Sequence, residues 1–276
     1  MAIQGMTSVV TLVFILILSE SGASYALSLP AALVGIVITS WICLVRGSRD
    51  PRVRDARNAF VRSRALSANR RVQIWSTALP MLAISLALPV TFQADRLILA
   101  WTTELTDVAT YSAAALVYLP ALSVVQLGGR SLWGDFAANR GAEQLPVLFS
   151  RSLFASTAIA ALGAVGLVSI GPLISSIATS GSVIASREIF VAFALLLVVQ
   201  GIHMPAGMYL TDTVGLRFQA MSAALMAVIA LPSGVLLAKQ IGVAGPIIST
   251  SISSIVIQVI PCIVFARMRM RKPDGI

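Results

Sequence analysis

Charged residues are scarce in this sequence, and that scarcity excludes most soluble proteins. Of 276 residues, 11% are charged and 57% are hydrophobic, whereas soluble domains carry roughly a quarter charged residues. The mean hydropathy is +0.90. The composition predicts a polytopic membrane protein and excludes a soluble enzyme, a secreted disulfide scaffold and a disordered tail. We also expect no nucleic-acid partner, although the net charge is +9.

Histidine and cysteine are almost absent, which leaves little for catalysis or metal binding. The chain has one histidine, His203, and two cysteines, Cys43 and Cys262, which lie in apolar runs away from any metal-ligand spacing. It contains no Walker loop, zinc set or Ser/His/Asp pattern. We therefore predict no enzyme activity, no cofactor and no metal site, and we expect the cysteines to serve as packing residues.

The N-terminal region lacks the positive charge of a signal peptide. An apolar run covers residues 9–18, but no Lys or Arg precedes it and a second apolar span follows at once. Because a signal peptide has a basic segment before its apolar core, we interpret this run as a retained first membrane helix.

Eight apolar runs are long enough to span a membrane, which takes about 20 residues as a helix. The predicted fold class is therefore all-α, a polytopic bundle of about eight transmembrane helices. The third run is the longest and contains Pro80 and Pro89, which favour bending. The predicted spans are residues 2–19, 25–45, 74–101, 109–129, 152–175, 188–211, 218–238 and 243–266.

The basic residues predict the orientation of these spans. With eight spans, 17 of the 20 Lys and Arg residues fall on one side, and an excess of Lys and Arg marks the cytoplasmic side. Both termini are therefore predicted inside. Nine arginines lie between the second and third spans: Arg46, Arg49, Arg52, Arg54, Arg57, Arg62, Arg64, Arg70 and Arg71.

This arginine-rich stretch divides the chain. We predict a two-helix unit at 1–45, a cytoplasmic loop at 46–73, a six-helix unit at 74–267 and a basic cytoplasmic tail at 268–276. The loop has two interpretations, a topology determinant that touches anionic lipid or a docking surface for a partner. An amphipathic interfacial helix within it is also consistent with the sequence.

The adjacent residues Asp95 and Arg96 are charged groups inside the third span. Ionisable groups at membrane depth are costly and are functional-site candidates by default. Adjacent helical residues point about 100° apart, so the two cannot simply neutralise each other. In one interpretation they face a solvated cavity, where Arg96 would attract an anionic substrate group and Asp95 would bind a cation, a proton or another helix. In the other, they form an interhelical salt bridge or snorkel to the membrane interface.

A second polar face occurs in the sixth span. Gln200, His203, Gly207 and Thr211 recur at helical spacing around the helix breaker Pro205. The face should point inward, and the carbonyl freed by the proline would be satisfied as in the interrupted helices that line transport sites. Gln200 and His203 therefore join Asp95 and Arg96 as candidate substrate-binding residues. The alternative is that His203 is an ordinary packing residue. In the eighth span, serines and Gln258 are expected chiefly to pack helices together.

Several short motifs resemble one family of transporters. Residues 93–100 (QADRLILA), followed by 108–114 (VATYSAA), resemble the region that opens the second lobe of polysaccharide (O-antigen type) flippases, members of the multidrug/oligosaccharidyl-lipid/polysaccharide exporter superfamily. Residues 241–250 (IGVAGPIIST) resemble the start of the last helix of that lobe, and 214–219 (VGLRFQ) one of its turns. The resemblance covers about residues 74–266.

The resemblance implies a fold and a function. Such flippases have two six-helix bundles around a central cavity, and they carry a lipid-linked oligosaccharide outward across the bacterial inner membrane for cell-surface polysaccharide biosynthesis. It implies that Asp95 lies near the cavity and that Arg96 could meet the diphosphate. Eight spans are fewer than the twelve or fourteen of the family, so we expect residues 1–45 to be the end of a first lobe. The missing part of the first lobe would come from a second copy of the chain or from a relative, or the chain is a shortened product of a longer gene.

Two other functions stay open. The chain could be a non-transporting scaffold that binds polysaccharide-assembly enzymes through its arginine-rich loop. It could also be a fragment of a major-facilitator transporter, because residues 134–141 (GDFAANRG) resemble a cytoplasmic loop of that family.

Overall fold

The structure, a computed structural model, describes residues 78–84 and 94–271. The chain divides into two compact units, residues 1–71 and 72–276. All described residues belong to the second unit, so the first two predicted spans and almost the whole arginine-rich loop fall in the other one. Those predictions, together with the end of the tail at 272–276, lie outside the described residues.

The described residues form helices and contain no strand, which confirms the all-α fold class. Residues 78–84 and 94–102 are helical and belong to the predicted third span, whose middle, including Pro89, lies outside the described residues. The remaining elements are α5 (Leu105–Ala138), α6 (Leu145–Ala178), α7 (Arg187–Tyr209), α8 (Thr213–Ile241), α9 (Ala244–Ser253), the π-helix η2 (Ser254–Val259) and α10 (Ile260–Arg271).

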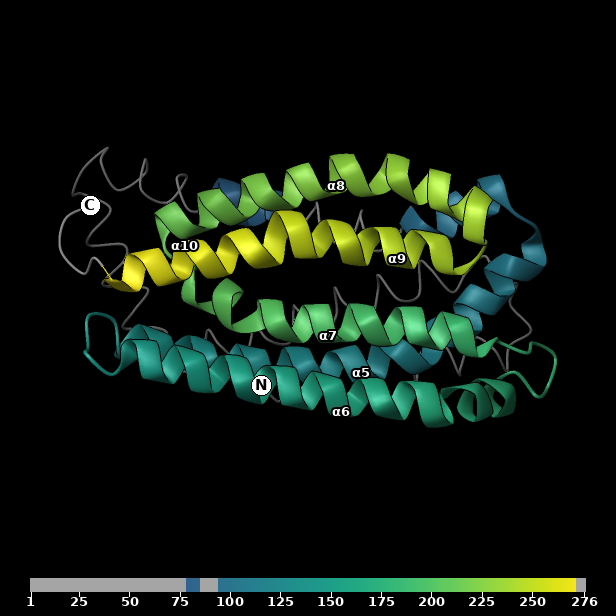
Figure 1. Cartoon of the computed structure of the whole chain (residues 1–276), viewed down its shortest axis with the longest axis horizontal. Coiled ribbons are helices and arrows are strands. Elements are labelled where there is room, and N and C mark those ends of the chain that lie inside the picture. The colour runs from purple at the N-terminus through teal and green to yellow at the C-terminus, as the bar shows by residue number, and fades with distance from the viewer. Residues whose placement is uncertain (1–77, 85–93, 272–276) are drawn as a thin grey trace, which may run out of the picture. The chain divides into compact units, whose positions relative to one another are not determined.

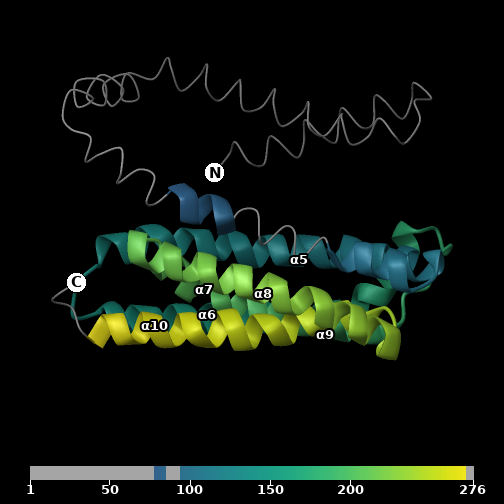
Figure 2. The same cartoon turned by 90° about the horizontal axis from the view of Figure 1, so that it is seen from above.

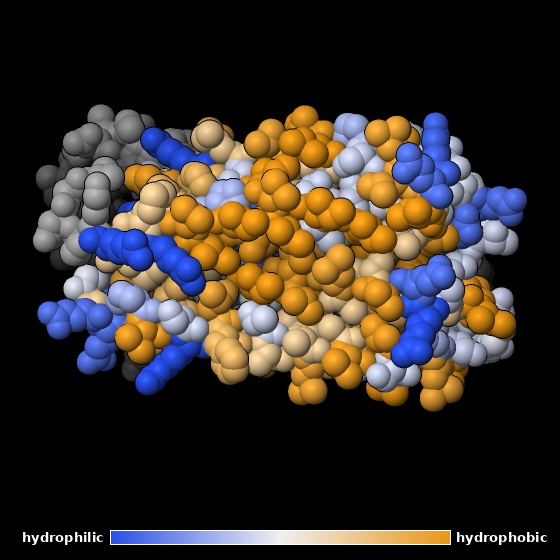
Figure 3. All heavy atoms as spheres, in the orientation of Figure 1, coloured by the Kyte–Doolittle hydropathy of each residue, from blue (hydrophilic) through white to orange (hydrophobic). Residues whose placement is uncertain are grey.

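The chain is a helical membrane protein. Within the described part, five helices are long and apolar enough to cross a bilayer, and they match the last five predicted spans. Large apolar side chains such as Leu162, Val165 and Val228 are exposed on the outside of the bundle. Figure 3 shows an apolar belt between two polar ends. A soluble monomer rarely exposes so large an apolar surface, whereas lipid would cover it.

Two helices are much longer than the apolar runs that predicted them. Helices α5 and α6 have 34 residues each, or about 51 Å at 1.5 Å per residue, against a hydrocarbon core of about 30 Å. The runs at 109–129 and 152–175 mark only the lipid-facing part of these helices. Residues 134–138, predicted as part of a loop in the major-facilitator interpretation, form the last turns of α5.

Helix α7 is the centre of the bundle. Its most apolar window is 72% buried, compared with 17% for α6. Figure 1 shows α7 between the α5–α6 pair and the layer of α8 and α9. Figure 2, turned by 90°, shows α5 and the last span, α9 to α10, along opposite edges of the bundle. Phe193 of α7 stacks against Tyr118 of α5, with ring centroids 4.6 Å apart. Because α7 contacts α5, α6 and α9, polar side chains on it lie in the interior rather than in lipid.

Small residues let the helices approach closely. A side chain at Gly201 would collide with Ala160, so α6 and α7 meet backbone to backbone here. Gly245 lies against the backbone of Leu237 in the same way. Between α8 and α9 the chain turns through Gly242, whose φ of 66° favours glycine because it has no Cβ.

The last span contains a π-helix that the sequence did not predict. Element η2 joins α9 to α10 and carries the buried side chains of Ser254 and Gln258. The Ser254 hydroxyl donates to Gln258 Oε1 over 3.4 Å, a long hydrogen bond. Short π-helical segments occur frequently at functional sites. The segment contacts α7 and α8 as well as its neighbours in the chain, and so it faces the bundle interior.

One end of the bundle gathers most of the described arginines, and we call it the arginine end. Here α5, α7 and α10 end and α6 and α8 begin. Its arginines are Arg130, Arg140, Arg151, Arg217, Arg267, Arg269 and Arg271. This grouping follows from the antiparallel order of the helices, and the sequence predicts that this end is cytoplasmic.

Polar contacts hold the arginine end together. Arg269 of α10 pairs with Asp212, the residue before α8, at 2.7 Å, and Arg140 donates to the carbonyl of Tyr209. Burial raises the pKa of Asp212, but the hydrogen bond and charge of Arg269, together with the charge of Arg140, lower it by more, so the pKa lies below its ordinary value. The ion pair therefore ties α10 to the start of α8 while Asp212 is ionised.

Candidate functional site

Asp95 is a buried carboxylate that joins three parts of the bundle. Its side chain is 3% exposed and lies on the 94–102 helical segment. Tyr111 of α5 donates to Oδ2 over 3.5 Å, and Thr250 of α9 donates to Oδ1 over 3.3 Å. Hydrogen bonds from hydroxyls to a carboxylate are usually about 2.5–2.7 Å long. The carboxylate is thus held loosely and keeps capacity for another partner.

Arg96 lies beside Asp95 but faces a different neighbour. It is partly exposed, and its guanidinium lies 5.9 Å from the centre of the Tyr111 ring, within the range of a cation–π contact. Tyr111 therefore contacts both charged residues, one through its hydroxyl and the other through its ring face. Both charged side chains line one pocket, and they contact different parts of Tyr111.

A small pocket connects these residues with α7, and we call it the Asp95 pocket. Asp95 and Arg96 line it from the helical segment, Tyr111, Tyr118 and Gln126 from α5, and Gln200 from α7, together with apolar residues. Its volume is about 110 Å³. A water molecule occupies about 30 Å³ of liquid, and pockets for drug-sized ligands measure about 300–1,000 Å³. The pocket has room for a few waters or a small ion.

Two polar groups on this pocket need a partner. Gln200 is 8% exposed and Tyr118 is 4% exposed, yet Gln200 Nε2 and Tyr118 Oη make no hydrogen bond within the described part of the chain. Leaving a buried donor unsatisfied costs about 1–3 kcal/mol. Water or a ligand in the pocket would remove that cost. The Asp95 pocket is therefore lined by polar groups from the 94–102 segment, α5 and α7, although it lies in an apolar bundle.

His203 does not line the Asp95 pocket. It follows Gln200 by one turn of α7 and is 8% exposed, with Nδ1 unpartnered among the described residues. A side chain at Gly207 would meet His203 Nε2 at 3.3 Å and Gln219 Oε1 at 3.4 Å. The four proposed site residues thus separate into a group of three, Asp95, Arg96 and Gln200, and His203 alone.

Carbonyl groups at the end of α7 accept hydrogen bonds from a glutamine that the sequence did not indicate as functional. Gln219 of α8 donates through Nε2 to the carbonyls of Gly207 and Leu210, at 3.2 and 2.8 Å. Helix α7 ends at Tyr209, so Thr211 lies beyond it and accepts a hydrogen bond from Trp133 Nε1 at 3.0 Å. The predicted polar face therefore covers Gln200, His203 and Gly207 and excludes Thr211.

The pocket includes several side chains that sequence reasoning did not assign to a site. Tyr111 and Tyr118 are seven residues apart, two helical turns, so helical periodicity could have placed them on one face. Thr250 was one of several polar residues in its span, and nothing in the sequence distinguished it. Among residues 78–84 and 94–271, no three His, Cys, Asp or Glu side chains group together as a metal site would require.

Comparison of the chain with protein-family models, curated proteins and solved structures finds no match.

Proposed function

We propose that this chain is a membrane transporter of the flippase type, which translocates a lipid-linked oligosaccharide for cell-surface polysaccharide biosynthesis. The observation that carries the proposal is the Asp95 pocket. It combines a buried carboxylate, an adjacent arginine and two unpartnered polar side chains. Charges within membrane-spanning segments are rare and mark substrate or ion pathways.

The two charged residues would have different roles in this proposal. Arg96 is partly exposed, and a guanidinium offers paired donors that suit a diphosphate. Asp95 contacts α5 and α9 through Tyr111 and Thr250. Binding of a cation or a proton at its carboxylate would alter contacts of both helices together. Such a link between a binding site and helix packing suits alternating access by rocking of helix bundles.

The size of the pocket limits what it can hold. At about 110 Å³, the Asp95 pocket is far smaller than the pockets that enclose drug-sized ligands. A lipid-linked sugar would therefore have to lie mostly outside this bundle, against a second lobe provided by another copy of the chain or by a relative. In that arrangement the pocket would receive only an ion, water or the charged end of the substrate.

A complementation experiment tests this role. In cells whose surface polysaccharide depends on this chain, Arg96→Ala should lower export at least about tenfold, because a lost charge-assisted contact of about 1.5–3 kcal/mol corresponds to a factor of ten or more. Arg96→Lys should retain part of the export. The matched control is Arg187→Ala, which removes an exposed arginine at the start of α7, outside the pocket.

The amount of each variant in the membrane is measured in the same cells. Unchanged export by Arg96→Ala at a normal membrane level would contradict the proposal. So would an equal loss of export in the Arg187→Ala control.

A further inference from the structure

A second hollow lies between α5 and α6, and we call it the α5–α6 groove. Val125, Ser131 and Leu132 line it from α5, and Arg151, Ser152 and Ile159 line it from α6. Its volume is about 370 Å³, more than three times that of the Asp95 pocket. None of its residues lines the Asp95 pocket. The groove is therefore a separate feature, and the proposed transport role does not explain it.

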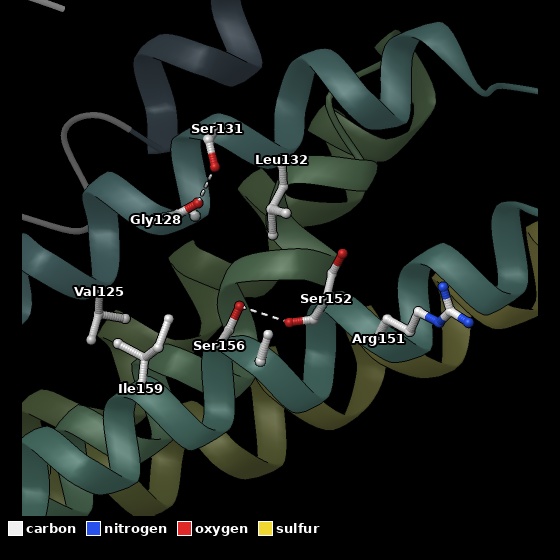
Figure 4. Close-up of a pocket in the computed structure, with 10 residues that line it drawn as sticks. Val125, Gly128, Ser131, Leu132, Arg151, Ser152, Ser156 and Ile159 are labelled. Carbon is white, nitrogen blue, oxygen red and sulfur yellow. Dashed lines mark hydrogen bonds between the residues drawn. The ribbon is translucent and has the colours of Figure 1, made fainter.

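The groove changes from apolar to polar along its length. Figure 4 shows Val125 and Ile159 together at one end and Arg151 extending from α6 at the other. Arg151 precedes Ile159 by eight residues, or about 12 Å along the helix. An occupant that fits this gradient has an apolar part and an anionic part about that far apart.

A free hydroxyl lies on the groove next to Arg151. Ser152 is 6% exposed, and Figure 4 shows its hydroxyl pointing toward α5. The neighbouring Ser156 donates to the carbonyl of Ser152, and Ser131 donates to that of Gly128, but within the described part of the chain the Ser152 hydroxyl makes no hydrogen bond. The hydroxyl is therefore free to donate a hydrogen bond to an occupant of the groove that offers an acceptor.

The depth of Arg151 matches that of lipid phosphates. Helix α6 is about 20 Å longer than the hydrocarbon core. If α6 is centred in the bilayer, about 10 Å of it protrudes at each end. Arg151 lies six residues, or about 9 Å, from the first residue of α6. Its guanidinium is thus near the boundary between acyl chains and headgroups, and Ser152 lies next to it.

We propose that the α5–α6 groove binds an anionic phospholipid of the leaflet at the arginine end. The phosphate pairs with Arg151 and accepts a hydrogen bond from the Ser152 hydroxyl. The first part of one acyl chain lies along Val125 and Ile159. Charge complementarity selects an anionic lipid, because the arginine end carries an excess of arginines, and basic pockets between membrane helices bind such headgroups.

Thermal unfolding of the purified full chain in non-ionic detergent tests this. Dioleoyl phosphatidylglycerol should raise the unfolding midpoint at least about 3 °C more than dioleoyl phosphatidylcholine, since a ligand that binds only the folded state stabilises it. Arg151→Gln should abolish most of this difference and Arg151→Lys should keep it. Arg217→Gln is the matched control, because Arg217 is an exposed arginine of the same end outside the groove.

Native mass spectrometry of the same samples provides a second readout, independent of stability. Wild-type chain should carry more phosphatidylglycerol than phosphatidylcholine, and Arg151→Gln should lose that preference even if its unfolding midpoint is low. Equal binding of the two lipids by the wild type would overturn the proposal, as would a preference that survives in Arg151→Gln or disappears equally in Arg217→Gln.

Two further arms separate a lipid from other occupants of the groove. Inorganic phosphate alone should not reproduce the stabilisation, and if it does, the acyl chain has no part in binding. Ala155→Phe places a ring in the groove, where Ala155 is one of the lining residues, and should reduce the number of bound phosphatidylglycerol molecules. If it instead converts a dimer to a monomer and leaves lipid binding unchanged, a second copy occupies the groove and the lipid proposal fails.

Discussion

At the scale of single residues, the Asp95 pocket depends on contacts between positions that are far apart in the chain. Tyr111 is 16 residues from Asp95 and Thr250 is 155 residues away. The sequence could identify Asp95 and Arg96, because charge in an apolar run is conspicuous. It could not identify Tyr111 or Thr250 as their partners, because hydroxyl side chains are common in membrane helices and only the packing selects among them.

The two tyrosines on the pocket provide a matched pair for measurement. The Tyr111 hydroxyl donates to a buried carboxylate, whereas the Tyr118 hydroxyl has no partner among the described residues. Tyr111→Phe should therefore lower the free energy of unfolding by about 1–2 kcal/mol, and Tyr118→Phe by less. Thermal or denaturant unfolding of the purified variants measures both. A larger cost for Tyr118→Phe would mean that the hydrogen bonds of the pocket are assigned wrongly.

Asp212 offers a pH-dependent test at the arginine end. Its pKa is lowered below the ordinary 3.8 in the folded protein, because burial raises it but the hydrogen bond and charge of Arg269, together with the charge of Arg140, lower it by more. A lowered pKa stabilises the fold at pH values above the unfolded pKa, and this contribution is lost as the pH falls through the folded pKa. Asp212→Asn should cost about 1 kcal/mol at pH 7. That cost should shrink as the pH falls below about 3.8 and disappear once the pH is below the folded pKa.

The control for this prediction is Glu143→Gln, in the exposed turn between α5 and α6. It should change stability little at either pH, because surface substitutions away from specific contacts are nearly neutral. A cost of Asp212→Asn that stays the same at low pH would show that the carboxylate charge does not stabilise the fold.

At the scale of helices, apolar runs predicted which segments are helical but not how far they extend. The sequence placed the last five spans correctly, because lipid-facing helices need continuous apolar residues. It underestimated the lengths of α5 and α6. Their ends continue through polar residues at the membrane interface, and an apolar run does not extend over those residues. It also missed the π-helix η2, because a π-helix depends on packing against α7 and α8 and has no composition of its own.

Close helix packing gives a prediction for two glycines. A side chain at Gly245 would collide with the backbone of Leu237, which cannot move aside, whereas one at Gly166 would meet nothing within 4 Å. Gly245→Ala should therefore force α8 and α9 apart and lower the free energy of unfolding by about 1–3 kcal/mol. Gly166→Ala should be neutral or stabilise by up to about 1 kcal/mol. Equal effects in a thermal unfolding assay would contradict the observed approach of α8 and α9.

At the scale of the whole molecule, the described bundle is a membrane-embedded unit with an apolar belt between polar ends (Figure 3). It has an arginine-bearing end and a polar pocket in its interior. Composition alone predicted the membrane location, and the antiparallel helices account for the clustering of arginines. The Asp95 pocket could not be predicted from composition, because a pocket is made by residues brought together only in the fold. The proposed substrate follows from the resemblance to flippases and from the chemistry of Arg96 and Asp95.

Translocation in proteoliposomes tests the central claim most directly. The full chain is reconstituted at a density that allows copies to associate, and the transfer of a fluorescent polyprenyl-diphosphate-linked sugar between leaflets is measured. Wild-type chain should move the lipid at least about tenfold faster than protein-free vesicles, and Asp95→Asn should remove most of that gain while it inserts normally. Transfer by the wild type at the rate of protein-free vesicles, or by Asp95→Asn at the wild-type rate, would contradict the account.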